Sequence, residues 1–193
     1  MTTRQPSRTW ALRAMCAAIA AFATVAVSVA GAQPASAEDS ASDGSVQAQI
    51  NDILARTTGG TQINENQIAW DDGTVVVTVT AGDEAAGGSS SGAVSAQAPD
   101  CDYQWTCLYE HVDFNNYKRG LTAAFYACDF FYLADYGLQD MASSWHNNQS
   151  GGAVSTVYDW TGDGWVVLWR SPPGSDAWVG SSVNDRADGI WAC

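Results

Sequence analysis

Short apolar runs alternate with turn-forming residues along the second half of the chain. The runs include "WTCLY", "LTAAFYA", "VSTVYDW" and "GWVVLW", and the turns between them include "DFNN", "NNQSGG", "TGDG" and "SPPGSD". Strands of this length, separated by turns at this spacing, are typical of an antiparallel sandwich or barrel. Alternation within "WVVLW" places Trp165, Val167 and Trp169 on one face of a strand, where we expect core packing. We therefore predict an all-β domain over 100–193.

A different pattern precedes this domain, between residues 38 and 80. Two glycines at 59 and 60 end a segment in which four apolar side chains recur at helical spacing: Val46, Ile50, Ile53 and Leu54. The segment "NQIAWDDGTVVVTVT" then predicts two strands around an Asp-Asp-Gly turn. Residues 38–45 are polar and predict a mobile start. We expect a small helix plus β-hairpin extension over 38–80, with a core too small to be very stable alone.

Two segments differ in composition from the parts that we expect to fold. Residues 81–99 lack periodicity and are rich in Gly, Ser and Ala, as in a flexible linker between the extension and the domain. Residues 1–37 carry arginines, an Ala-rich apolar stretch and then "ASA", as in a secretory signal peptide with its cleavage site. An uncleaved membrane anchor is the alternative, since the apolar stretch is almost long enough to span a bilayer. We expect cleavage before Glu38, secretion to the extracellular space, and no membrane contact afterwards.

The chain is strongly acidic, with 21 acidic and 8 basic residues and a formal net charge of −13. Removal of the leader makes this charge more negative, because residues 1–37 contain basic but no acidic side chains. Phosphate binding needs clustered Lys and Arg. Nucleic acids and anionic membranes are therefore not expected as partners.

Four cysteines follow the predicted leader: Cys101, Cys107, Cys128 and Cys193. An even number in an exported chain favours two disulfides over a metal site. Four cysteines allow three pairings. We favour a bond between Cys101 and Cys107, which closes a short loop at the start of the domain. Cys128 would then pair with Cys193 and tie the last strand to the first half.

A turn that contains aspartate occurs twice, as "LQDMASSW" at 138–145 and "VNDRADGIW" at 183–191. Aligned on Asp140 and Asp185, the two segments share the acid, the alanine two residues later and a tryptophan at the end. The strand "CLYE" likewise matches "TVYD" further along, and both matches keep the same order. The domain is therefore predicted to contain two similar four-stranded units packed face to face.

These residues resemble the βγ-crystallin Greek-key motif, whose signature turn is Asn/Asp, Asn/Asp, two free positions, Ser/Thr, Ser. More closely, "CDYQWTCLYEHVDF" with "YGLQDMASSWHNN" resembles the secreted bacterial peptidase-inhibitor family I36, which uses the same crystallin-like fold. The resemblance covers roughly 100–193. It implies a two-Greek-key βγ-crystallin-like sandwich and a proteinaceous inhibitor whose partner is an extracellular protease.

The paired turns of that fold can hold calcium, which takes several hard oxygen ligands. The side chains that match the ligand positions are Asp140, Ser143, Asp185 and Asp188. Gln139 stands where Asn or Asp is expected, and Asp188-Gly189 replaces the final Ser/Thr-Ser. In the alternative interpretation these side chains only stabilise the turns by hydrogen bonds to the backbone.

A protease inhibitor needs an exposed segment held in an extended shape, because its ordering entropy is then lost before binding. The prolines of "RSPPGSD" fix the backbone, so we expect the inhibitory loop to be Arg170, Ser171, Pro172, Pro173, Gly174, Ser175 and Asp176. The alternative for this segment is an ordinary connection between strands. The alternative function is a calcium-binding structural or surface-binding protein without inhibitory activity.

No catalytic constellation stands out, and we do not expect an enzyme. His111 and His146 are the only histidines, and their polar strand or turn surroundings favour surface or packing roles. The acids Asp159 and Asp163 are explained by the turn that contains them. Exposed tryptophans in the second half could form a sugar-stacking face, although such residues more often fill a core.

Overall fold

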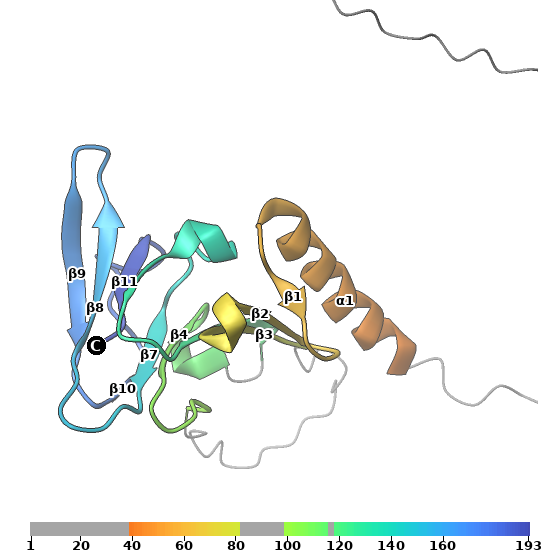
Figure 1. The fold of residues 1–193 in the computed structure, drawn as a ribbon, viewed down its shortest axis with the longest axis horizontal. Helices are drawn as coiled ribbons and strands as arrows, with labels where there is room; N and C mark the ends of the chain where they lie inside the picture. The colour runs from red at the N-terminus through yellow and green to blue at the C-terminus, as the bar shows by residue number, and fades with distance from the viewer. Residues whose placement is uncertain (1–38, 82–98, 116–117) are drawn as a thin grey trace, which may run out of the picture. The chain divides into compact units, whose positions relative to one another are not determined.

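The computed structural model in Figure 1 describes residues 39–81, 99–115 and 118–193. The signal peptide predicted over 1–37 and nearly all of the linker predicted over 81–99 lie outside the described residues. Within the described ranges the chain forms one α-helix, eleven β-strands and three short 3-10 turns, and the strands form two antiparallel sheets. The prediction of a mainly β fold is confirmed. No helix in these ranges is long and apolar enough to cross a membrane.

The larger sheet has seven strands in the order β1-β2-β3-β5-β4-β7-β10. Its first three strands come from the extension and the other four from the main domain. Their bounds are β1 Thr61–Gln62, β2 Gln67–Trp70, β3 Val75–Thr80, β4 Thr106–Tyr109, β5 Gly120–Phe125, β7 Ser144–Asn147 and β10 Gly174–Asp176.

The smaller sheet has four strands in the order β6-β11-β8-β9. Their bounds are β6 Phe130–Tyr132, β8 Ser155–Trp160, β9 Trp165–Ser171 and β11 Gly189–Trp191. The strands after residue 100 fall into two runs, β4 to β7 and β8 to β11, and the third strand of each run lies in the other sheet. Thus β6 pairs with β11, whereas β10 pairs with β7.

The helix α1, Asp39–Arg56, begins within the segment that the sequence predicted to be mobile. Its apolar positions explain where it forms, because Val46, Ile50 and Ile53 are buried on one face. Once these side chains hold the central turns, each residue added toward the amino terminus gains a backbone hydrogen bond at low cost. The polar segment therefore continues the helix instead of forming a separate mobile start.

The hairpin predicted around Asp-Asp-Gly is confirmed. Strand β2 pairs antiparallel with β3, and buried and half-buried residues alternate along both. Three consecutive residues between them have positive φ, at 51° for Asp71, 55° for Asp72 and 87° for Gly73. Asp and Gly are the residue types that adopt this backbone conformation most readily.

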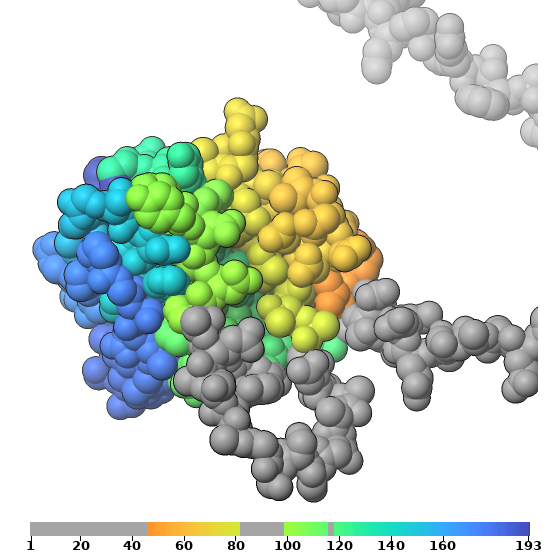
Figure 2. Space-filling model, turned by 90° about the horizontal axis from the view of Figure 1, so that it is seen from below, coloured from red at the N-terminus to blue at the C-terminus, as the bar shows by residue number. Residues whose placement is uncertain are grey.

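The extension and the main domain share one sheet. Strand β3 pairs with β5 from Val75 opposite Phe125 to Thr80 opposite Gly120. Figure 2 shows the yellow atoms of the hairpin directly against the green atoms that follow residue 100. The sequence predicted a linker between these parts. Hydrogen bonds nevertheless join the strands on its two sides, and the described residues belong to one compact unit.

One buried cluster runs through the helix and both sheets. It contains Ile53 of α1, Val77 of β3 and Phe125 of β5, together with Val157 and Ile190 of the smaller sheet. All five are completely buried, at 0% exposure. Burial of apolar surface is the main stabilising term in folding, so the extension completes the core of the domain.

The expectation that Trp165, Val167 and Trp169 all face the core is wrong for the first two. Trp165 is 38% exposed and Val167 is 46% exposed, whereas Trp169 packs against the core. The cause is a register shift: Trp169 lies opposite buried Val157, but Val167 lies opposite Tyr158. Because one residue of β9 has no partner at this bulge, the side chains beyond it change face.

Candidate functional site

The two Asp turns lie against each other. The backbone N–H of Asp140 donates to the carbonyl oxygen of Ala187 at 2.8 Å, and the N–H of Asp185 donates to that of Ala142 at 3.3 Å. Both aspartates have positive φ, 58° and 54°, which Asp tolerates better than most residues. The two alanines are buried, at 4% and 0% exposure. The repeated acid and alanine in the sequence thus build a reciprocal contact between the turns.

Side-chain oxygens of the second turn are already engaged by donors of the protein. The Ser143 hydroxyl donates to Oδ1 of Asp185 at 3.4 Å, and the Asn184 amide donates to Oδ2 of Asp185 at 2.5 Å. Oδ2 of Asp188 accepts the backbone N–H of Trp160 at 2.8 Å. Only the contact of Asp188 is the bond to the backbone that the alternative interpretation predicted; the other two join side chains.

Asp140 differs, because its carboxylate has negative neighbours. Burial raises the pKa of this group first, and the charges of Asp188, Asp159 and Asp185 raise it further. The described residues contain no group of three His, Cys, Asp or Glu side chains arranged to hold a metal ion. Calcium at these turns would have to compete with the hydrogen bonds that the carboxylates of Asp185 and Asp188 already accept.

The seven residues predicted as an inhibitory loop span three parts of the fold. Two end β9, two form a link between the sheets, and three form β10: Arg170 and Ser171, then Pro172 and Pro173, then Gly174, Ser175 and Asp176. Every residue from 172 to 176 is exposed. The segment is therefore both a connection between strands and an accessible stretch of extended chain.

Hydrogen bonds hold this segment at both ends. Ser171 is 1% exposed, and its carbonyl oxygen accepts the Asn147 side-chain amide at 2.7 Å. Strand β10 pairs with β7 from Gly174 opposite Asn147 to Asp176 opposite Trp145. The Asp176 carboxylate also accepts the backbone N–H of Trp178 at 3.1 Å. The exposed prolines thus lie between two anchored ends.

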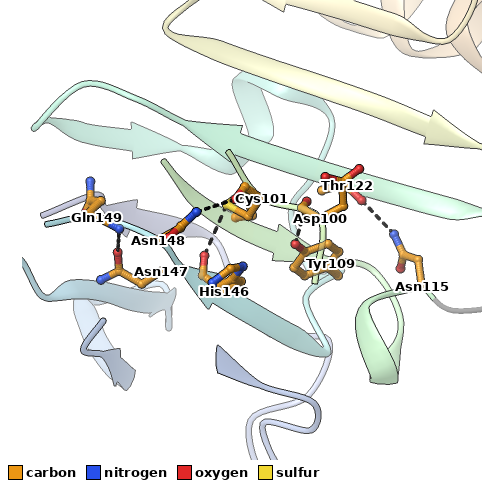
Figure 3. Close-up of a disulfide and its surroundings, with 10 residues drawn as sticks. Asp100, Cys101, Tyr109, Asn115, Thr122, His146, Asn147, Asn148 and Gln149 are labelled. Carbon is orange, nitrogen blue, oxygen red and sulfur yellow. Dashed lines mark hydrogen bonds between the residues drawn. A yellow bond between two sulfur atoms is a disulfide. The ribbon is translucent and has the colours of Figure 1, made fainter. Parts of the chain in front are cut away.

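Both disulfides have the pairing favoured from the sequence. Cys101 bonds to Cys107 with the Cα atoms 6.0 Å apart, and Cys128 bonds to Cys193 with the Cα atoms 5.2 Å apart. Figure 3 shows the first bridge, where the Asn148 side-chain amide donates to the carbonyl oxygen of Cys101 at 2.8 Å. This bond ties the start of the domain to the end of β7.

The two histidines are in separate places. His111 Nε2 lies 2.9 Å from the carbonyl oxygen of Arg119. His146 is in β7, where burial lowers the pKa of its imidazole. Its backbone carbonyl oxygen lies 3.6 Å from Sγ of Cys101, a contact that Figure 3 marks with a dashed line. Among the described residues, neither histidine ring forms a hydrogen bond with an acid or a hydroxyl group.

An aromatic surface covers the outer face of the smaller sheet, and it includes Trp165, which was expected in the core. We call it the outer aromatic face, and its residues are Phe130, Tyr132, Tyr158, Trp160 and Trp165. Tyr132 and Trp160 are 52% and 47% exposed. The sequence contained a signal, because "FFY" and "DW" put aromatic residues at alternate positions of two short strands, β6 and β8. Only the outward orientation of Trp165 depends on the bulge in β9.

Comparisons with known proteins give no relative: no protein-family model matches the chain, and no curated protein or solved structure matches it significantly.

Proposed function

We propose that this chain is a secreted protease inhibitor with a double Greek-key domain of the βγ-crystallin type. The exchange of the third strand of each run, β6 and β10, supports the double Greek key. Two disulfides support an oxidising, extracellular location. The signal peptide over 1–37 would direct export, and the mature chain would begin at Glu38.

The observation that carries the inhibitory function is the anchored, exposed segment 170–176. Its extended backbone is accessible from Pro172 to Asp176, while the Asn147 amide and the pairing with β7 fix its two ends. A protease binds its substrates as extended chain. A segment already ordered in this shape loses little entropy on binding, which favours tight association without large contact area.

The test is a titration of the purified mature protein against thermolysin-like metalloproteases and serine proteases, with intact inhibitor verified by mass. The variant Pro172→Gly with Pro173→Gly should raise the inhibition constant roughly 4- to 30-fold, because each glycine restores freedom to the unbound segment. A matched control is Ser181→Gly with Ser182→Gly, at two exposed residues outside the segment. Equal inhibition by both double variants would remove the segment from the mechanism, and no inhibition by the native protein would remove the function.

Calcium binding without inhibition is the second candidate function. The negative charges of several carboxylates around Asp140 favour it. The carboxylates of Asp188, Asp159 and Asp185 raise the pKa of Asp140 in addition to burial. A cation would relieve this repulsion, and the side chains that would hold it are Asp140, Ser143, Asp185 and Asp188. Calorimetric titration with calcium chloride tests this candidate.

The informative variant in that titration is Asp140→Asn with Asp185→Asn, because Asn also tolerates positive φ and retains an oxygen. Loss of binding in this double variant, with retention in Asp163→Asn, would support the site. Asp163 is an exposed acid in another turn and serves as the control. Unchanged calcium affinity in the double variant would reject it.

A further inference from the structure

The outer aromatic face contains an open hollow of about 580 Å³. We call it the aromatic hollow, and its lining residues are Tyr132, Ala134, Gln139, Trp160, Trp165 and Asp188. Three rings, one amide and one carboxylate therefore meet at one surface depression. It is separate from segment 170–176, whose residues do not line it.

The rings of the hollow are inclined to one another. Trp165 is in contact with both other rings: its centroid is 5.2 Å from that of Trp160 and 5.8 Å from that of Tyr132. The interplanar angles are 54° and 56°. Since the three rings are not coplanar and line the same depression, they form a curved aromatic surface instead of a flat one.

Trp165, the ring that contacts both of the others, is held in place by packing against Phe130. Phe130 contacts Trp165 edge to face, with the centroids 5.1 Å apart. Gly189 of β11 leaves the space for both rings, because a Cβ there would lie 2.6 Å from the Phe130 ring and 3.0 Å from the Trp165 ring. The aromatic surface is thus ordered by packing within the protein, as a preformed binding site requires.

Negative charge collects around the hollow. Asp188 lines it, and one of its carboxylate oxygens accepts the backbone N–H of Trp160. Asp140 is close enough to Asp188 for that charge to raise its pKa. Asp159 is also near, but its carboxylate is paired with Arg186 at 2.5 Å. The chain as a whole carries a net charge of −13.

We propose that the aromatic hollow binds a quaternary ammonium group of a small soluble molecule. The faces of aromatic rings attract cations, and a quaternary ammonium is the cation that aromatic sites recognise best because it has no strongly held hydration shell. Asp188 supplies the opposite charge at the rim. An anionic ligand is disfavoured by the acids around the hollow, whereas a neutral sugar would use them only as hydrogen-bond acceptors and gain no attraction between opposite charges.

The test uses the full chain in calcium-free buffer and calorimetric titration with choline chloride. A parallel titration uses 3,3-dimethylbutan-1-ol, which has the shape of choline but no charge. Saturable binding of choline and none of the neutral alcohol is the expected result. Phosphocholine should bind more weakly than choline, because its phosphate meets the acids around the hollow.

Variants separate cation recognition from simple apolar contact. Trp160→Leu keeps an apolar side chain but removes the ring, and should weaken choline binding about fivefold to tenfold. Asp188→Asn keeps an oxygen for the Trp160 N–H and should weaken binding about fivefold. Trp178→Leu is the control, because Trp178 is 45% exposed but does not line the hollow.

Several outcomes would overturn the proposal. These are equal binding of the neutral alcohol, tighter binding of phosphocholine than of choline, or unchanged affinity in Trp160→Leu with the fold intact by circular dichroism. Saturable binding of cello-oligosaccharides with no binding of choline would assign the hollow to carbohydrate instead. Inhibition of proteases should be the same in Trp160→Leu as in the native protein, so the two proposals succeed or fail separately.

Discussion

Replacement of Val77 by alanine tests whether the extension is part of the domain core. Val77 is completely buried in β3, opposite Ile68 of β2 on one side and Ala123 of β5 on the other. The change removes two carbon atoms, worth about 0.8 kcal/mol each in transfer from water. The cavity left behind adds to this, and we expect a total loss of about 2–3 kcal/mol in the free energy of unfolding.

The assay is urea unfolding followed by far-UV circular dichroism and by tryptophan fluorescence. If β3 and β5 form one cooperative unit, both signals should show one coincident transition, and Val77→Ala should move the whole transition to lower urea. Val76→Ala is the control: Val76 is a half-buried neighbour on the other face of β3 and should cost less than about 1 kcal/mol. Two transitions, with only the smaller one moved by Val77→Ala, would refute the shared core.

Three further predictions concern stability. Replacement of Cys128 and Cys193 by serine should cost about 4 kcal/mol in the free energy of unfolding, because the bridge closes a sequence separation of 65; chemical denaturation checks this. Gly60→Ala should lower the melting temperature, since its Cβ would lie 2.6 Å from the buried ring of Trp70, at a cost of about 1–3 kcal/mol. Asp140→Asn should raise the urea midpoint at neutral pH, because the raised pKa of Asp140 makes its ionised form destabilising; this gain should shrink as the pH falls toward about 4 and vanish below about pH 3, where the carboxyl is protonated in both states.

Local patterns predicted the extension well. The helix needed only the spacing of Val46, Ile50 and Ile53, and the hairpin needed only alternation around Asp71 and Asp72. These signals act between residues close in the sequence, and the physical preferences behind them are strong. The disulfide pairing favoured among the three possible ones is also the pairing observed, although the positions of the cysteines did not exclude the other two.

Long-range pairing could not be predicted in the same way. The alignment of β3 with β5 joins segments on both sides of residues 81–99, and no local signal specifies which edge of a sheet a hairpin will extend. Strand β10, within segment 170–176, also depends on long-range pairing. Its three exposed residues lack strand periodicity, and only the neighbouring edge of β7 makes them a strand.

The candidate sites depended on both kinds of information. The repeat of Asp140 and Asp185 was visible in the sequence, and the structure adds the reciprocal backbone contact between the two turns.

The tryptophans of β9 show why register matters. The prediction from "WVVLW" assumed that every residue of the strand has a partner in β8, so that alternate side chains face the core. The bulge opposite Val157 and Tyr158 breaks that assumption. Since a single unpaired residue reverses the side-chain face, it moves Trp165 from the expected core to the outer surface beside Trp160. The same aromatic residues can therefore fill a core or form a binding surface. Which of the two they do depends on the register between β8 and β9, and that register is set by the pairing of the strands in the folded protein.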